Sequence, residues 1–205
     1  MTDKFIFSLI QQLNKTLPGK KSHQIMKVRF NSDLNREPVL TRYASVLICL
    51  FPVNKDWNFF LTKRSGSVEH HKGQISFPGG VIEKDEDPMN AALRETNEEI
   101  GIQSKRIQII GELSSIYIPV SNFKVQPYVG FLNKKPKTKI NKQEVSKLFH
   151  VKLNDLLNNK NLKSEEKLLG DELVKIPYFS LKNEKIWGAT SLILSEFKDV
   201  LKNII

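Results

Sequence analysis

A helix predicted over residues 88–100 constrains the fold of this 205-residue chain more than any other segment. Its boundaries are marked on both sides. Asp87 suits the N-cap, Pro88 suits the first helical position, and Gly101 suits the position after the last turn. One face carries mostly apolar side chains at helical spacing, which we expect to be buried: Met89, Ala92, Leu93, Thr96 and Ile100. The rest of the chain must therefore supply an apolar surface that covers this face.

Three carboxylates crowd the end of the same predicted helix. Glu95, Glu98 and Glu99 fill an arc of about 100° that faces away from the apolar stripe. Glu95 and Glu99 are a repelling i,i+4 pair, and the helix dipole disfavours each anion in the last turn by roughly 0.3–1 kcal/mol. Arg94 and Glu98 have the spacing of a helical ion pair, which offsets little of this cost. We therefore interpret the cluster as ligands for a divalent cation such as Mg²⁺, in preference to a solvated acidic face.

The remaining sequence predicts a mixed α/β domain in which helices cover a sheet. Segments 4–17 and 186–205 have helical spacing of apolar residues, and segments 43–53 and 57–65 are placed to pair as a hairpin. A glycine-bearing loop leads into residues 73–82. Four further apolar-rich segments are read mostly as strands: 106–118, 123–132, 145–153 and 172–181. A short helix is expected near residues 153–159. Hydrophobic residues make up 40% of the chain, which excludes wholesale disorder.

The charge of the chain favours anionic partners. A net charge of +10 raises the local concentration of nucleic acid, a membrane surface or a phosphorylated small molecule. The densest basic run, residues 133–139, contains Pro136 and no aromatic residue for base stacking, so we read it as a solvated loop. A nucleic-acid partner is accordingly disfavoured, and a small anionic substrate is preferred.

The apolar runs and the single cysteine indicate a cytoplasmic protein. The run at 44–53 is far shorter than the about 20 residues that span a bilayer, so no membrane partner is expected. The first fifteen residues do not resemble a signal peptide. Cys49 lies inside the apolar run, where a small buried hydrophobe in a reducing compartment is the expected role. The sequence does not determine the oligomeric state, and a homodimer is one of the candidates.

Residues 80–102, GVIEKDEDPMNAALRETNEEIGI, resemble the Nudix box. In that motif a glycine, a glutamate, an Arg-Glu pair, a Glu-Glu pair and a closing glycine with an apolar residue stand at fixed spacings. The matching residues here are Gly80, Glu86, Arg94, Glu95, Glu98, Glu99, Gly101 and Ile102. Thr96 departs from the motif, where the family has an aliphatic side chain, but this position lies on the buried face and carries no chemistry.

The resemblance implies a Nudix α/β/α sandwich that hydrolyses a nucleoside diphosphate linked to another moiety. The Nudix domain would occupy residues 39–205, and residues 1–38 would form an N-terminal helical extension. Mg²⁺ or Mn²⁺ would be held by Glu95, Glu98, Glu99 and the carbonyl of Gly80.

The resemblance also assigns roles around the metal. Glu86 would pair with Arg94 and orient the loop and helix. Glu144 resembles a later family glutamate that reaches the metals from a loop, which makes Glu95, Glu98 and Glu144 the candidate catalytic residues. Either Glu95 or Glu144 would be the general base, and the sequence does not choose between them.

A second resemblance lies in residues 61–80, LTKRSGSVEHHKGQISFPGG, which are similar to the signature of coenzyme A pyrophosphatases. Residues 186–194 resemble the ending of the same subgroup. The signature matches at nine positions: Leu61, Thr62, Arg64, Ser65, Gly73, Phe77, Pro78, Gly79 and Gly80. It implies that coenzyme A or an acyl-CoA is split into 3′,5′-ADP and 4′-phosphopantetheine or its acyl form. The candidate substrate-binding residues are Arg64, Lys63 and Gly79, with Arg64 placed to bind the diphosphate.

Glu69 departs from this signature, since the subgroup has an arginine there. A carboxylate would repel the phosphate that an arginine would hold, so ADP-ribose or a dinucleotide is the alternative substrate. A non-catalytic nucleotide-binding Nudix domain is the second alternative, which the intact glutamates disfavour.

Four histidines and two aromatic residues are assigned no role in chemistry. His70 and His71 are read as loop residues, and His23 and His150 as incidental. Trp187 and Phe77 are expected in the core, in preference to acting as stacking platforms for a base.

Overall fold

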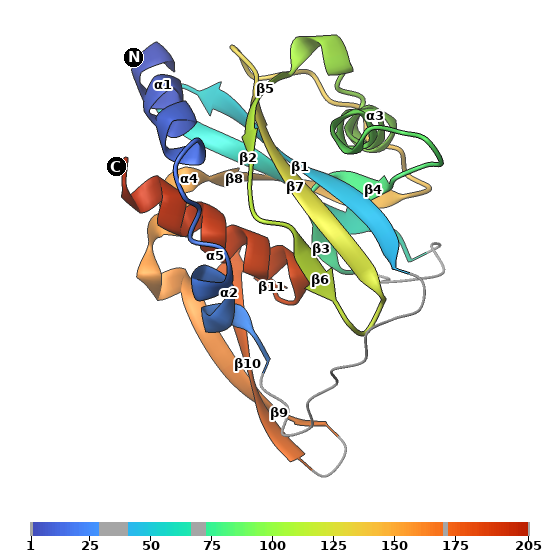
Figure 1. The fold of residues 1–205 in the computed structure, drawn as a ribbon, viewed down its shortest axis with the longest axis vertical. Helices are drawn as coiled ribbons and strands as arrows, with labels where there is room; N and C mark the ends of the chain where they lie inside the picture. Colours follow the sequence, from blue (N-terminus) through green and yellow to red (C-terminus); the bar gives the residue numbers. More distant parts are fainter. Residues whose placement is uncertain (1, 29–40, 67–72, 170–171, 205) are drawn as a thin grey trace.

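The computed structural model shown in Figure 1 describes residues 2–28, 41–66, 73–169 and 172–204. Its centre is a twisted sheet in which β3 (Ile75–Ser76), β2 (Asp56–Arg64), β1 (Arg42–Val53), β7 (Phe123–Phe131) and β5 (Gln108–Glu112) follow in that order. Three further strands join it: β4 (Gly79–Val81) pairs with β1, β6 (Ile116–Ile118) with β7, and β8 (Val145–Lys152) with β2. The pair β1–β7 is parallel, and the remaining pairs are antiparallel. The sheet is therefore mixed.

The predicted hairpin of β1 and β2 is confirmed. Leu50 lies opposite Phe59 and Val53 lies opposite Asp56, so two residues remain for the turn. Asn54 takes the first turn position with a φ of 55°, a left-handed conformation that asparagine tolerates better than most residues.

Alternate residues of β1 face two separate cores, and this alternation creates the layers. Ile48 and Leu50 belong to the core beneath α1 (Thr2–Leu13) and α5 (Ala189–Lys202). Leu47, Cys49 and Phe51 belong to the core beneath α3 (Pro88–Ile100). Figure 1 shows α3 on one side of the sheet and α1 and α5 on the other. The predicted α/β architecture with helices covering a sheet is confirmed.

Cys49 is fully buried beneath α3, as predicted, and burial raises the pKa of its thiol to about 12. A thiol with so high a pKa is almost entirely protonated and unreactive at neutral pH. Its role is to fill space in the core.

Residues of the predicted N-terminal extension pack on the main core. Ile6, Leu9 and Leu13 of α1 and Met26 of α2 (Lys20–Met26) are buried in it. The sequence did not predict α2, because Pro18 and Gly19 mark a break and the segment that follows them is short and mostly polar. The proposed boundary at residue 38 lies outside the described residues and stays a prediction.

A second sheet has the order β11-β10-β9, formed by β11 (Glu184–Ile186), β10 (Glu172–Leu181) and β9 (Leu162–Leu169). It follows α4 (Leu153–Leu157) and the short 3₁₀ turn η2 (Asn159–Asn161); another 3₁₀ turn, η1 (Ser104–Arg106), follows α3. In Figure 1 the hairpin of β9 and β10 extends away from the rest of the molecule. Phe77 is buried as predicted, but Trp187 is 49% exposed, so its assignment to the core is wrong. It comes directly after β11, and its side chain lies beside exposed or partly exposed side chains of β9, β10 and β11.

No helix within the described ranges is both long and apolar enough to cross a membrane.

Candidate functional site

Helix α3 begins and ends where the sequence predicts. The Asp87 side chain accepts hydrogen bonds from the backbone N–H groups of Met89 and Asn90, at 3.0 and 3.1 Å. Gly101 ends the helix in the left-handed conformation, with φ 73° and ψ 22°. These caps fix which residues form the last turn and therefore where its carboxylates point.

Thr96, the residue that departs from the family motif, is satisfied within the helix. It is fully buried, and its hydroxyl donates to the carbonyl of Ala92 at 2.7 Å. The hydroxyl therefore adds no unpaired polar group to the core beneath α3.

Strand β4 brings glycine backbone against both β1 and α3. A Cβ on Gly79, whose φ is 149°, would stand 2.3 Å from the carbonyl oxygen of Ser45. A Cβ on Gly80 would stand 2.4 Å from the carboxylate carbon of Glu95. Both positions require glycine because the neighbouring atoms occupy the space of a side chain.

Arg94 connects the loop before α3 with two of the three carboxylates on the helix. Its Nε and Nη2 donate to the two oxygens of Glu86, at 2.8 and 3.0 Å, which is the pair that the family resemblance implies. Nη1 donates to Glu95 at 2.9 Å and to Glu98 at 3.1 Å. The hydrogen bonds from Arg94 hold the pKa of Glu86 below its usual range.

Three carboxylates converge: Glu95 and Glu99 from α3 and Glu144 from the turn before β8 have ligand atoms within 4.8 Å of one another. Glu98 is not among them, because its side chain is 49% exposed and is held by Arg94. The structure therefore brings together two of the three predicted helix ligands with the predicted loop glutamate, and places Glu98 at the edge.

Glu99 is the most buried of the three. Helical angle alone places it away from the apolar stripe, yet it is 2% exposed, because elements outside the helix cover it. Burial raises its pKa to about 8, and the charges of Glu95 and Glu144 add to this, while Arg64 and a backbone hydrogen bond from Gly79 act in the opposite direction. Burial also raises the pKa of Glu95, against the lowering effect of Arg94. Both shifts disfavour the ionised form of these carboxyl groups, which is the form that a bound cation would stabilise.

Asn141, which was not among the predicted site residues, bonds two members of this cluster. Its backbone N–H donates to the carbonyl of Glu99 at 2.8 Å, and its side chain donates to Glu144 at 2.8 Å. The sequence offers one weak signal: Asn141 begins the polar stretch NKQE, and asparagine favours turns because its side chain can bond the backbone two residues on.

The two predicted basic residues at the end of β2 diverge. Arg64 faces Glu99 closely enough to lower its pKa, and its buried Nε has no hydrogen-bond partner among the described residues. Lys63 points elsewhere, with Nζ 3.0 Å from both carboxylate oxygens of Glu184 on β11. Glu69, His70 and His71 lie outside the described residues.

The donor set fits a divalent cation. Carboxylate oxygens are the ligands that hard cations prefer, and Oε2 of Glu99 is buried without a hydrogen-bond partner in the described part of the chain. Glu95, Glu99 and Glu144 would hold such an ion, and a cation there would supply the charge that the cluster lacks.

Comparison with known proteins decides the family. The family model for the NUDIX domain matches residues 41–171, which include β4, α3 and Glu144. This chain belongs to the Nudix hydrolase family. It is therefore a pyrophosphohydrolase of nucleoside diphosphate derivatives, and Nudix hydrolases use divalent metal ions.

Relatives and solved Nudix structures agree with this assignment. The chain is 33% identical over 193 residues to "Nudix hydrolase 15, mitochondrial" of Arabidopsis thaliana, covering 89% of this chain and 67% of that protein. It is 30% identical over 156 residues to the "Uncharacterized Nudix hydrolase NudL" of Photorhabdus laumondii, covering 76% of this chain and 82% of the relative. The Nudix hydrolase RenU of M. smegmatis has the same fold, with a TM-score of 0.54, 15% identity, and coverage of 80% of this chain and 88% of that one.

Proposed function

We propose that this Nudix hydrolase splits coenzyme A or an acyl-CoA into 3′,5′-ADP and 4′-phosphopantetheine or its acyl form. The signature in residues 61–80 supports this substrate, and Arg64 belongs to that signature. One observation carries the proposal: the guanidinium of Arg64 adjoins the glutamate cluster and has a buried Nε with no partner in the described chain. A diphosphate oxygen is the kind of acceptor that would satisfy it.

The reaction is the attack of water on one phosphorus of the diphosphate bridge. The water oxygen forms a bond to phosphorus, the bond from that phosphorus to the bridging oxygen breaks, and the other phosphate leaves. The carboxylate of Glu95 or of Glu144 accepts the proton of the water. Burial raises the pKa of Glu95 above its usual range, which favours proton acceptance by this carboxylate when no cation is bound. Arg64 would hold the diphosphate in the orientation that the attack of the water requires.

Mg²⁺ or Mn²⁺ is the proposed cofactor, held by Glu95, Glu99 and Glu144 with the predicted carbonyl of Gly80. When bound, such an ion neutralises the charge of the diphosphate and lowers the pKa of a neighbouring water. Glu98 was predicted as a ligand and a catalytic residue; its bond to Arg94 supports a role in orienting that arginine.

A different nucleoside diphosphate derivative, such as ADP-ribose or a dinucleotide, is the second candidate. Glu69 favours it, because a carboxylate at that position removes a phosphate contact that the coenzyme A signature contains.

The test is a panel of coenzyme A, acetyl-CoA, ADP-ribose and a dinucleoside polyphosphate, incubated with Mg²⁺ or Mn²⁺ and followed by mass spectrometry. We expect turnover of coenzyme A that Glu99→Gln abolishes. Glu83→Gln is the matched control, because Glu83 is an exposed glutamate in the loop before the same helix. Turnover of ADP-ribose alone would contradict the coenzyme A assignment, and turnover that survives Glu99→Gln would contradict the metal assignment. No turnover of any compound would favour a non-catalytic nucleotide-binding domain.

A further inference from the structure

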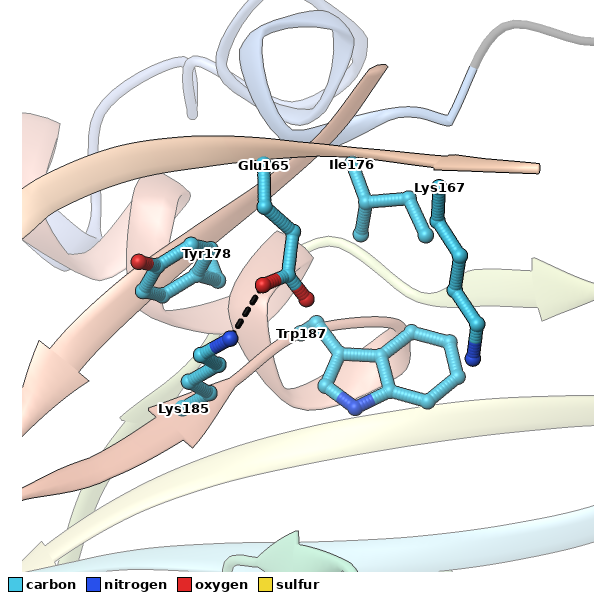
Figure 2. Close-up of a pocket in the computed structure, with 6 residues that line it drawn as sticks. All are labelled: Glu165, Lys167, Ile176, Tyr178, Lys185 and Trp187. Atoms are coloured by element: carbon cyan, nitrogen blue, oxygen red, sulfur yellow. Dashed lines mark hydrogen bonds and ion pairs between the residues drawn. The ribbon is translucent and has the colours of Figure 1, made fainter. Parts of the chain in front are cut away.

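The outer face of the second sheet carries a groove outside the glutamate cluster. It is lined by side chains of β9, β10 and β11 and by the residue that follows β11, shown in Figure 2: Glu165, Lys167, Ile176, Tyr178, Lys185 and Trp187. On the opposite face of the same sheet, Phe179, Leu181 and Ile186 are buried in the main core, whereas Leu173 and Lys175 farther along β10 are exposed. The sheet is therefore anchored on the main core by the part of this face next to β11.

Trp187 forms one wall of this groove. Trp187 is 49% exposed, although the preceding residue, Ile186, is buried. Figure 2 shows Ile176 between Glu165 and Lys167, with the side chain of Lys167 reaching toward the edge of the indole and the Glu165 carboxylate directed at Lys185. The space has a volume of about 160 Å³. That is below the about 300 Å³ at which pockets for whole small ligands begin, so it suits one end of a larger molecule.

Of the two lysines in the groove, one is paired with a carboxylate and the other is not. Lys185 pairs with Glu165 and also lies over the Tyr178 ring, 5.2 Å from its centroid. Lys167 makes no hydrogen bond or ion pair with any described residue and is exposed beside the indole. A flat aromatic wall next to an unpaired ammonium group is suited to a planar ring that carries a phosphate.

Two contacts tie the chain around Trp187 to the strands β2 and β3. Three residues before Trp187, Glu184 pairs with Lys63, whose side chain diverges from that of the neighbouring Arg64. Three residues after it, the hydroxyl of Thr190 donates to the carbonyl of Ile75 on β3 at 2.9 Å. Three residues span at most about 10 Å of chain, so Trp187 is held near the edge strand that leads into Gly79 and Gly80.

We propose that this groove is the subsite for the adenine ring and 3′-phosphate at one end of the substrate, with the ring stacked on Trp187 and the phosphate on Lys167. The inference rests on the proposed function, because coenzyme A carries a phosphate on the ribose next to its adenine. The pantetheine arm, a flexible chain of amides, has no planar ring to match the indole. The two halves of the substrate would thus extend from the glutamate cluster in different directions.

Fluorescence tests this subsite without any hydrolysis. The chain has two tryptophans, Trp57 and Trp187, and the Trp57→Phe protein leaves Trp187 as its single reporter. Titration of this metal-free protein with 3′,5′-ADP is expected to quench the fluorescence of Trp187 to saturation. The ligand 5′-AMP lacks the 3′-phosphate of 3′,5′-ADP. Its Kd should be roughly tenfold higher, as expected for the loss of one charged hydrogen bond.

Lysine variants separate a specific contact from general attraction. Lys167→Glu should weaken binding of 3′,5′-ADP roughly tenfold or more. The control is Lys175→Glu on β10, an exposed lysine of the same hairpin that lies opposite Glu166 and outside the groove. Equal weakening by both variants, or no saturable quenching, would overturn the subsite.

Kinetics show whether the groove serves the substrate or a separate nucleotide. Trp187→Leu is expected to raise KM for coenzyme A roughly tenfold with little change in kcat, and Trp187→Phe to restore most of the loss. An unchanged KM together with persistent quenching by 3′,5′-ADP would mean a separate site and would overturn the proposal. Quenching that occurs in a protein unable to hydrolyse coenzyme A would contradict the proposed function and leave the groove as a nucleotide site.

Discussion

Asn141 holds Glu144 beside the end of helix α3. Its side-chain amide donates to Glu144 at 2.8 Å, while its backbone N–H donates to the carbonyl of Glu99 at the same distance. Its own carbonyl accepts from the N–H groups of Glu144 and Val145. One residue thereby links the carboxylate of Glu144 to the backbone of Glu99, which is far from it in the sequence, and sets where the loop glutamate lies relative to the helix.

Replacement of Asn141 by alanine should loosen this arrangement. We expect kcat and the affinity for Mn²⁺ to fall by roughly 10- to 100-fold, the usual cost of removing a group that orients a metal ligand. The affinity is measured on the protein alone by calorimetric titration with Mn²⁺. Asn161→Ala is the matched control, because that amide also donates a short hydrogen bond, to the carbonyl of Asp155, but far from the cluster. Equal losses in both variants would show that Asn141 acts on folding only.

Gly80→Ala should abolish activity without unfolding the protein. A Cβ at this position would stand 2.4 to 2.6 Å from the carboxylate atoms of Glu95, so the carboxylate must move away from Glu99 and Glu144. We expect a loss of kcat of roughly 100-fold or more, since a misplacement of about 1 Å can cost that much. Circular dichroism would report the fold, and Gly66→Ala provides the control, because a Cβ there meets no atom within 4 Å. Activity within a few-fold of the parent protein would contradict the assignment of Glu95.

Arg94→Lys should cost stability as well as activity. Lysine keeps the charge but cannot donate to both oxygens of Glu86 and also reach Glu95 and Glu98, as the guanidinium does. We expect the free energy of unfolding in urea to fall by about 1–3 kcal/mol, the cost of unpairing a partly buried charged group. Arg106→Lys is the comparison, since Arg106 is exposed and forms no ion pair among the described residues. An unfolding free energy that stays within error of the parent would contradict the linking role.

The parts of the fold that local signals specify could be predicted. Helix α3 has a cap at each end, and β1 and β2 are apolar strands joined by a two-residue turn. Strand β9 was missed because Lys163, Glu165, Glu166 and Lys167 give it the composition of a solvated segment. It forms a strand through pairing with β10, which a local pattern does not contain. The exposure of Trp187 likewise depends on which face of that distant sheet is open.

The candidate site could be predicted in its residues but not in its arrangement. The motif identifies the glutamates of α3, whereas helical angle cannot tell that Glu99 is covered and Glu98 is not. That difference arises from β4, Arg64 and the turn at Asn141, which reach the helix from other segments. Lys63 illustrates the same limit, because its partner Glu184 lies 121 residues away.

The packing of the N-terminal helices against α5 predicts a pH-dependent stability. Glu196 on α5 is fully buried and accepts hydrogen bonds from the N–H of Gly19 at 3.0 Å and the hydroxyl of Ser114 at 2.6 Å, while Nε2 of His23 lies 3.0 Å away. His23, read from the sequence as incidental, thus has a structural partner. Burial alone would raise the pKa of Glu196, but the hydrogen bonds from His23 and Ser114 outweigh it and hold the pKa below its usual range.

The direction of the pH effect follows from that lowered pKa. The ionised carboxylate of Glu196 stabilises the fold above the pKa of an unfolded glutamate, about 4.3, and this contribution is lost as the pH falls through the lower pKa of the folded state. The free energy of unfolding should therefore drop more steeply from about pH 6 to about pH 3 in the parent protein than in Glu196→Gln. At neutral pH the variant should be less stable by about 1–3 kcal/mol, because one carboxylate oxygen becomes an amide that cannot accept from its neighbours. Urea denaturation at several pH values measures both effects, with Glu166→Gln, an exposed glutamate of β9, as the control. Parallel pH profiles for the parent and Glu196→Gln would show that the buried carboxylate does not anchor the N-terminal helices through its charge.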